Sequence, residues 1–172
     1  ISVSNLPRQT IYTTHEVGRS KAQCAAERLR AANPHCDITA YSERLTEANA
    51  TRLIGEVDLL IDATDNEATR LLLDHYASEH HIPWLYASLE GWCGQLALFL
   101  PDSPSRYRDL FPEGDKEDAP SPAQAPFPVM ATTPAVIAAA EALKLLLGLP
   151  SPLTEGLLLI DSLQLSFQLI RC

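Results

Sequence analysis

Three clusters of polar residues have the composition needed to bind an anionic ligand together with a metal ion. The first, Ser4 to Gln9, contains two amides and a guanidinium, those of Asn5, Gln9 and Arg8. It lies at the end of Ile1-Ser2-Val3-Ser4-Asn5, which we interpret as the tail of a strand, and ligands of α/β proteins bind beyond the carboxyl ends of strands. These side chains either contact a ligand or form an ordinary polar turn with a surface arginine.

The second cluster, Gly18-Arg19-Ser20-Lys21, opens the first predicted helix. Cations in a first turn oppose the helix dipole, at a cost of about 0.3–1 kcal/mol where they are exposed. A bound anion offsets this cost, because the helix N-terminus and Lys21 then act together on a phosphate. The alternative is a solvated basic turn.

The third cluster, Asp62 to Asn66, follows a predicted buried strand and precedes a predicted helix. The carboxylate of Asp65 suits Mg²⁺, which takes one or two protein carboxylates and completes its shell with phosphate oxygens and water. The alternative is that Asp65 or Asn66 caps the next helix. Asp62 lies nearer the strand, and we expect it to be structural.

The elements that position these clusters alternate between helices and strands. The patterns predict helices over 19–32, 47–54 and 67–79 and strands over 37–41, 57–61 and 84–87. The run 57–61 is continuously apolar and too short for a helix, which is typical of a strand buried on both faces of a parallel sheet. The sequence therefore predicts an α/β fold with a doubly wound, mostly parallel, Rossmann-like sheet.

The C-terminal half has a different character. An apolar stretch at 95–100 leads into a segment rich in proline and acidic residues, 101–128, which we interpret as a flexible crossover loop. A helix is predicted over 134–147, closed by Gly148, and two antiparallel strands over 156–161 and 165–170. We interpret residues 1–172 as a single domain, incomplete at its N-terminus because no Gly-x-Gly-x-x-Gly phosphate loop is present.

Composition and charge exclude several classes of partner. Hydrophobic residues make up 46% and charged residues 20%, and the net charge is -9. An acidic chain is unsuited to wholesale binding of nucleic acid or an anionic membrane. No apolar run reaches bilayer length, and no signal peptide is visible. The scattered cysteines, which form no Cys-x-x-Cys pair, predict reduced thiols in a cytoplasmic protein: Cys24, Cys36, Cys93 and Cys172.

Together the motifs resemble the ThiF/MoeB/HesA family of adenylating domains in order and spacing, nearly from end to end. The motifs that carry the resemblance are Ser4-Asn5-Leu6-x-Arg8-Gln9, Gly18-x-x-Lys21-Ala22, Asn33-Pro34, Asp62-x-Thr64-Asp65-Asn66-x-x-x-Arg70, Gly91-x-x-Gly94-Gln95 and Glu141-Ala142-Leu143-Lys144-Leu145-Leu146-x-Gly148.

The resemblance implies a homodimeric enzyme that uses ATP and Mg²⁺. Such an enzyme adenylates the terminal Gly-Gly carboxylate of a ubiquitin-like sulfur carrier of the ThiS or MoaD type and releases pyrophosphate. By position, Asn5, Arg8 and Lys21 would contact the nucleotide, with Gln9 nearby. Asp65 would serve Mg²⁺ and the transferring phosphate, with Asn66 beside it. The carrier, and the product it serves (thiamine, molybdopterin or another sulfur compound), stay open.

The departures from the family pattern lead to further expectations. The glycine-rich loop, a ribose-binding acid and an arginine donated by the partner subunit would all lie upstream of Ile1, so we expect the chain as given to be inactive. Arg106-Tyr107-Arg108-Asp109 stands where many members have a zinc-binding Cys-x-x-Cys pair, so no structural zinc is expected. Residues 113–128 contain no cysteine for a sulfur relay. For Cys93, a buried, inert thiol is favoured over a reactive one.

Two other interpretations remain. The chain could be a non-catalytic family member that binds a carrier or pairs with an active partner. It could also be a nicotinamide-dependent oxidoreductase on a similar sheet, although the Thr64-Asp65-Asn66 context argues against this reading. An upstream glycine-rich loop preceded by an arginine favours the adenylating enzyme. A ribose-binding acid after an upstream Gly-x-Gly-x-x-Gly favours the oxidoreductase.

Overall fold

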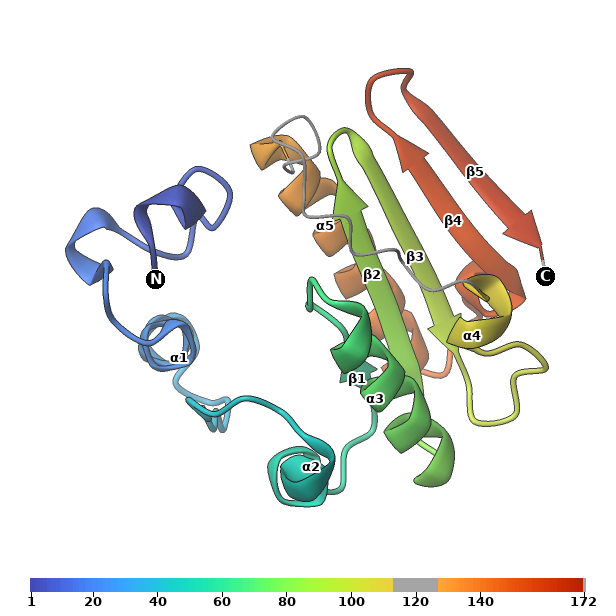
Figure 1. Ribbon diagram of the computed structural model, residues 1–172, viewed down its shortest axis with the longest axis horizontal. Helices are drawn as coiled ribbons and strands as arrows, with labels where there is room; N and C mark the ends of the chain where they lie inside the picture. The colour runs from blue at the N-terminus through green and yellow to red at the C-terminus, as the bar shows by residue number, and fades with distance from the viewer. Residues whose placement is uncertain (113–126, 172) are drawn as a thin grey trace. The chain divides into compact units, whose positions relative to one another are not determined.

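The computed structural model describes residues 1–112 and 127–171 (Figure 1). These residues form two compact units, Ile1–Leu45 and Thr46–Cys172, which are described separately below. No helix among the described residues is both long and apolar enough to cross a membrane.

The first unit contains two short 3-10 helices, η1 (Val3–Asn5) and η2 (Thr14–Glu16), and helix α1 (Lys21–Ala32). Ser20 caps α1, because its hydroxyl accepts a hydrogen bond from the amide of Gln23. The helix ends before Asn33-Pro34, as predicted. The amide of Gly18 donates to the carbonyl of Ile1 over 2.9 Å and so ties the start of the chain to the start of α1.

The strand predicted at residues 37–41 does not form in the structure. This segment has no regular secondary structure and belongs to no backbone ladder among the described residues. Side chains of α1 hold it instead: Gln23 Nε2 donates to the carbonyl of Ala40 over 3.3 Å, and Arg30 donates to the carbonyl of Ile38. The local pattern is that of a strand, but a strand also needs a hydrogen-bonding neighbour.

The second unit is built on a five-stranded sheet in the order β1-β2-β3-β4-β5. Its strands are β1 (Leu60–Ile61), β2 (Trp84–Glu90), β3 (Cys93–Phe99), β4 (Gly156–Asp161) and β5 (Ser166–Arg171). Strands β1 and β2 are parallel, and the other three pairs are antiparallel. The predicted α/β class, with antiparallel strands toward the C-terminus, is confirmed, and the parallel part within the described residues is β1–β2.

A tight hairpin turns the sheet from parallel to antiparallel. Glu90 pairs with Cys93, so that Gly91 and Trp92 alone connect β2 to β3. Gly91 has a positive φ of 53°, which such two-residue loops require and which glycine adopts without a steric penalty. The connection is too short for a crossover helix, so β3 must run back beside β2.

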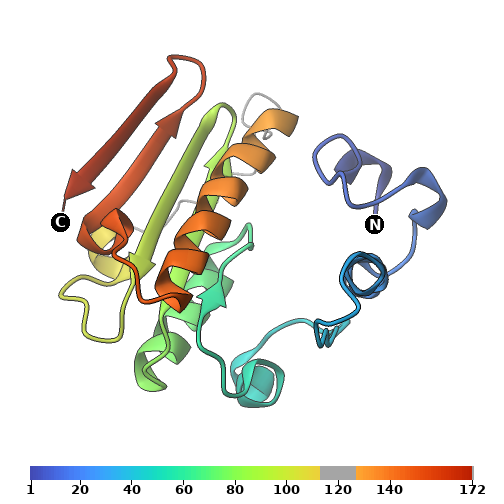
Figure 2. The same cartoon turned by 180° about the vertical axis from the view of Figure 1, so that it is seen from behind.

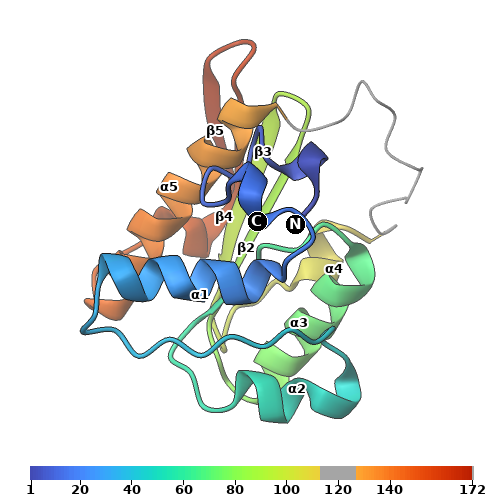
Figure 3. The same cartoon turned by 90° about the vertical axis from the view of Figure 1, so that its left-hand side faces the viewer.

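Helices cover both faces of the sheet. Helix α5 (Pro128–Leu146) lies on one face, whereas α3 (Glu67–Glu79) and the short α4 (Tyr107–Leu110) lie on the other (Figures 2 and 3). The unit also contains α2 (Glu47–Ile54) and the 3-10 helix η4 (Pro152–Glu155). Of the predicted crossover loop 101–128, residues 107–110 form α4 and Pro128 begins α5; residues 113–126 lie outside the described residues.

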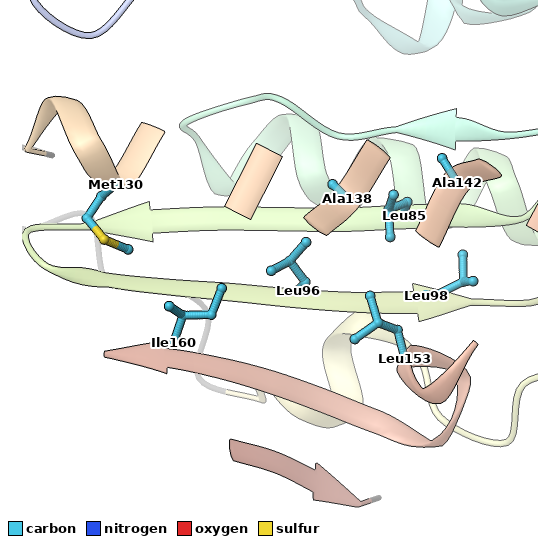
Figure 4. Packing of buried hydrophobic residues seen from close by; sticks show 8 residues of the cluster. All are labelled: Leu85, Leu96, Leu98, Met130, Ala138, Ala142, Leu153 and Ile160. Carbon is cyan, nitrogen blue, oxygen red and sulfur yellow. The ribbon is translucent and has the colours of Figure 1, made fainter. Parts of the chain in front are cut away.

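The main core lies between α5 and the sheet (Figure 4). Small residues of the helix, Ala138 and Ala142, allow it to approach Leu85, Leu96 and Leu98 closely. The remaining buried members are Met130, Leu153 and Ile160. Helix α5 begins six residues before the predicted start at Pro134, because Pro128 occupies its first turn and Pro134 lies inside the helix.

Aromatic side chains fill the opposite face. The rings of Trp84 and Phe99 stack at 5.2 Å, and Tyr107 of α4 lies 5.3 Å from Tyr86 and 4.8 Å from Phe111. Tyr107 is fully buried. These contacts fasten α4 to the strands β2 and β3.

Candidate nucleotide and magnesium site

In the turn between β1 and α3, the neighbouring residues Asp65 and Asn66 have different roles. Asn66 is the N-cap of α3: its side-chain oxygen accepts hydrogen bonds from the amide of Thr69 over 3.0 Å and from its hydroxyl over 2.7 Å. Asp65 is exposed, and its carboxylate has no hydrogen-bond or ion-pair partner among the described residues. Of the two candidate caps, Asn66 therefore takes the role, and the carboxylate of Asp65 stays available to a ligand.

Asp62, at the end of β1, serves the backbone of this turn. Its side chain is buried, and its Oδ1 accepts a hydrogen bond from the amide of Thr64 over 2.7 Å. Burial raises the pKa of Asp62, while the hydrogen bonds from Thr64 and the charge of Arg70 act in the opposite direction. The structural role predicted for Asp62 agrees with this geometry.

Arg70 is a buried cation whose role the sequence alone does not indicate. Its Nη2 donates to the carbonyl of Thr64 over 3.1 Å and to the hydroxyl of Ser88 over 3.2 Å. Its Nε lies 3.6 Å from Oδ2 of Asp62, and its guanidinium carbon lies 5.5 Å from the ring centre of Tyr86. The available signal was its place, four residues after the helix cap, where one turn of helix returns a side chain to the loop.

Asn5, Arg8 and Gln9 lie in a compact turn of the first unit. Asn5 Oδ1 accepts from the amide of Ser2 over 3.1 Å, and Arg8 Nη1 donates to the carbonyl of Ser4 over the same distance. The cluster begins within the 3-10 helix η1, where the tail of a strand was expected. No carboxylate among the described residues pairs with Arg8.

Tyr12 connects this turn to the start of α1. Its amide donates to the carbonyl of Gln9 over 3.1 Å, and its hydroxyl donates to the carbonyl of Lys21 over 3.1 Å. The Lys21 side chain has no acidic partner among the described residues. Arg19, by contrast, pairs with Glu27 at 2.8 Å. The first unit therefore groups Asn5, Arg8, Gln9 and Lys21, while Asp65 and Asn66 belong to the second.

The exposure of the cysteines and the arrangement of possible metal ligands are relevant to sulfur chemistry and metal binding. Cys24 is buried, whereas Cys36 and Cys93 are exposed. The expectation of a buried Cys93 is wrong, because this residue begins β3 beside the hairpin turn, opposite Glu90 and Asp161. No group of three or more His, Cys, Asp or Glu residues in the described chain is arranged to hold a metal ion.

Comparison with known proteins decides the family. The ThiF family model matches residues 1–172. The chain belongs to the ThiF family. It is 41% identical to a sulfur carrier protein adenylyltransferase of Thermus thermophilus and 34% identical to a probable adenylyltransferase/sulfurtransferase, MoeZ, of Mycobacterium tuberculosis. It is 31% identical to the sulfur carrier protein ThiS adenylyltransferase of Escherichia coli.

The alignments with these three relatives cover nearly all of this chain but only part of each relative. The alignments cover 98%, 99% and 90% of this chain and 65%, 45% and 62% of the Thermus, mycobacterial and E. coli proteins, respectively. Among solved structures, E. coli MccB with ATP matches with a TM-score of 0.83 at 17% identity, over 99% of this chain and 53% of that one. This likeness shows that the ThiF chain and MccB share a fold.

Proposed function

We propose that the protein containing this ThiF chain is an ATP-dependent adenylyltransferase that activates the C-terminal Gly-Gly of a ThiS- or MoaD-like sulfur carrier. The observation that carries the proposal is the exposed carboxylate of Asp65, which lies in the turn after β1, where Asn66 and not Asp65 caps the following helix. The names of the relatives at 31–41% identity support this activity.

In this reaction a carboxylate oxygen of the carrier attacks the α-phosphorus of ATP. A new phosphorus–oxygen bond forms, the bond from the α-phosphorus to the α,β-bridging oxygen breaks, and pyrophosphate leaves. Negative charge grows on the leaving group, so fixed cations and helix dipoles accelerate the step. Arg8 and Lys21, with the N-terminus of α1, would hold the phosphates. Asn5, Gln9 and Asn66 would line the nucleotide site.

The residues of the β1–α3 turn suit Mg²⁺. Asp65 presents an exposed carboxylate without a partner in the described chain, and Mg²⁺ usually binds proteins through one or two such groups. Asp62 cannot serve in the same way, because its carboxylate is buried against Thr64 and Arg70. When bound, Mg²⁺ would neutralise charge on the phosphates. Asp65 would hold it in place.

We further propose that the protein is a cytoplasmic homodimer without structural zinc. Helix α5 is apolar on its outer side as well as its inner one: Val136 is 62% exposed, Leu143 61% and Leu146 56%. A helix that is hydrophobic all round is normally covered, and the proposed cover is a second copy. Sedimentation equilibrium should give a dimer at micromolar concentration, and elemental analysis should give far less than one zinc per chain. A monomer, or stoichiometric zinc, contradicts the respective proposal.

Pyrophosphate exchange tests the activity. The full-length protein should catalyse the exchange of labelled pyrophosphate into ATP when given a carrier that ends in Gly-Gly, and not when given the same carrier without its last two residues. Exchange with neither carrier, combined with tight carrier binding in calorimetry, would instead identify a non-catalytic carrier-binding protein.

A further inference from the structure

We propose that Arg70 is the positioning residue that fixes the direction of Asp65, an inference that rests on the proposed function. Arg70 is 6% exposed and lies one turn into α3. The parts of the unit that its buried guanidinium contacts include the β1–α3 turn, the end of β1 and strand β2.

The contacts fall on both sides of the residue that precedes Asp65. Asp62 accepts from the amide of Thr64 over 2.7 Å, and Arg70 donates to the carbonyl of the same residue over 3.1 Å. Both backbone polar groups of Thr64 are thus held by buried side chains. The peptide plane that leads into Asp65 therefore has little freedom to rotate.

Asp62 and Arg70, which together hold Thr64 as a clamp, are themselves hydrogen-bonded to the sheet. The amide of Asp62 donates to the carbonyl of Leu85 on β2 over 2.9 Å, and Arg70 donates to the hydroxyl of Ser88 further along that strand. Tyr86, between them, places its ring beside the guanidinium. The turn is thereby fixed to the rigid strand β2, and rigid support is what a ligand-binding carboxylate needs.

A lysine would not reproduce the arrangement. The planar guanidinium donates to Thr64 and Ser88 while its Nε side faces Asp62, whereas an ammonium group is a single point on a flexible stem. A buried ion pair is on its own weak evidence for stability, since apolar residues often replace such pairs without loss. The hydrogen bond to the carbonyl before Asp65 gives Arg70 a task that an apolar residue cannot perform.

The test uses Arg70→Met and Arg70→Lys in the full-length protein, with Arg106→Met as the matched control. Arg106 makes similar contacts, since its Nη2 donates to the hydroxyl of Ser78 and the carbonyl of Pro101, but it contacts none of residues 62–66. Binding of Mn²⁺ in the presence of a non-hydrolysable ATP analogue, followed by electron paramagnetic resonance, reports on Asp65 without requiring turnover. Both Arg70 variants should bind Mn²⁺ at least tenfold more weakly, and the control should bind it normally.

Kinetics separate positioning from general stability. Each Arg70 variant should lower kcat at least tenfold and leave the KM for ATP nearly unchanged. In an Asp65→Asn background the Arg70 substitution should cause no further loss, because its effect passes through Asp65. A folded Arg70→Met protein with normal Mn²⁺ binding, or losses that simply multiply, would overturn the proposal.

Two further outcomes keep the test decisive. If Arg70→Met does not fold, Arg70→Lys decides, because it keeps a positive charge beside Asp62: normal Mn²⁺ binding by that variant overturns the proposal. If the wild-type protein binds Mn²⁺ with the nucleotide analogue but exchanges no pyrophosphate with any Gly-Gly carrier, the proposed function fails while the role of Arg70 toward Asp65 stands or falls on the binding data.

Discussion

Asp62 and Asp65 share one turn but have opposite environments. Asp62 is 1% exposed and hydrogen-bonded to the backbone, and burial raises its pKa. Asp65 is exposed, and Asn66 beside it provides the helix cap. At the scale of single residues the turn thus separates a structural carboxylate, a capping amide and a carboxylate available to a ligand.

Substitution of Asp65 should reduce catalysis and leave stability nearly intact. Asp65→Ala and Asp65→Asn should lower the rate of adenylation by roughly two to four orders of magnitude, as expected for the loss of a strong electrostatic stabiliser. The melting temperature should hardly change, because Asn66 is the cap. Asn66→Ala, which removes the cap, should instead cost about 1 kcal/mol in the free energy of unfolding. A normally active Asp65→Asn enzyme would remove Asp65 from the mechanism.

Lys21 and Arg19 should differ in their effect on ATP binding although they lie two positions apart. Lys21 has no acidic partner in the described chain, whereas Arg19 is paired with Glu27. A hydrogen bond to a charged group contributes about 1.5–3 kcal/mol, so Lys21→Ala should weaken ATP binding roughly 10- to 100-fold. Calorimetry with the full-length protein measures this difference. Equal effects of Lys21→Ala and Arg19→Ala would show that the α1 N-terminus contributes only general charge.

At the scale of elements, β3 and α5 are in close contact at Gly94 and Pro134, and this contact depends on both residue types. Gly94 of β3 is buried, and a Cβ added there would lie 2.7 Å from Cγ of Pro134 and 3.4 Å from Cε of Met130. The absent side chain leaves room for the proline ring of α5. A proline inside a helix normally breaks or kinks it, so Pro134 looked like a helix start in the sequence.

Gly94→Ala should therefore destabilise the second unit. Overpacking of this kind costs about 1–3 kcal/mol, which urea unfolding measures as a shift of the midpoint at constant slope. Adding Pro134→Ala removes the atom that the new methyl group would meet, so the double variant should recover part of the loss relative to the two single variants. Strict additivity of the two substitutions would contradict the close contact.

Glu16 gives the first unit a dependence on acid pH. Hydrogen bonds from the Thr13 hydroxyl and from Arg28 lower the pKa of Glu16 from 4.5 to about 2. A lowered pKa in the folded state means that the stabilisation is present above the unfolded-state value and is lost as the pH falls from about 4.5 toward 2. Melting temperatures measured over this range should fall more steeply for the wild type than for Glu16→Gln. A Glu16→Gln variant that keeps the wild-type slope would contradict the role of Glu16.

The accuracy of the sequence predictions followed how local each signal was. Helices α2 and α3 were predicted with the bounds observed, because a polar cap and an amphipathic pattern are contained within each segment. The strand at 37–41 and the start of α5 depend on partners distant in sequence, and both were predicted wrongly. Asp65 and Lys21 could be named as candidates from their places at helix starts. The contacts of Arg70 could not be predicted, because Ser88 and Thr64 come within reach of its side chain only in the folded protein.

At the scale of the whole molecule, the candidate residues are divided between two units. The cations and amides proposed for the nucleotide lie in Ile1–Leu45, and the carboxylate proposed for Mg²⁺ lies in Thr46–Cys172. The chain carries a net charge of -9, which repels ATP at long range. Under the proposed function, binding of ATP would depend on local cations such as Arg8 and Lys21 and on a metal ion to neutralise the phosphates.

The most direct test of the proposed activity is the detection of the adenylated carrier itself. The full-length protein, ATP, Mg²⁺ and a Gly-Gly carrier should be mixed, and the intact mass of the carrier followed over time. We expect a carrier heavier by one AMP group, which hydroxylamine converts to the hydroxamate; formation of this adduct should require both Asp65 and the terminal glycine. A carrier of unchanged mass, under conditions in which the protein binds both ATP and the carrier, would contradict the account.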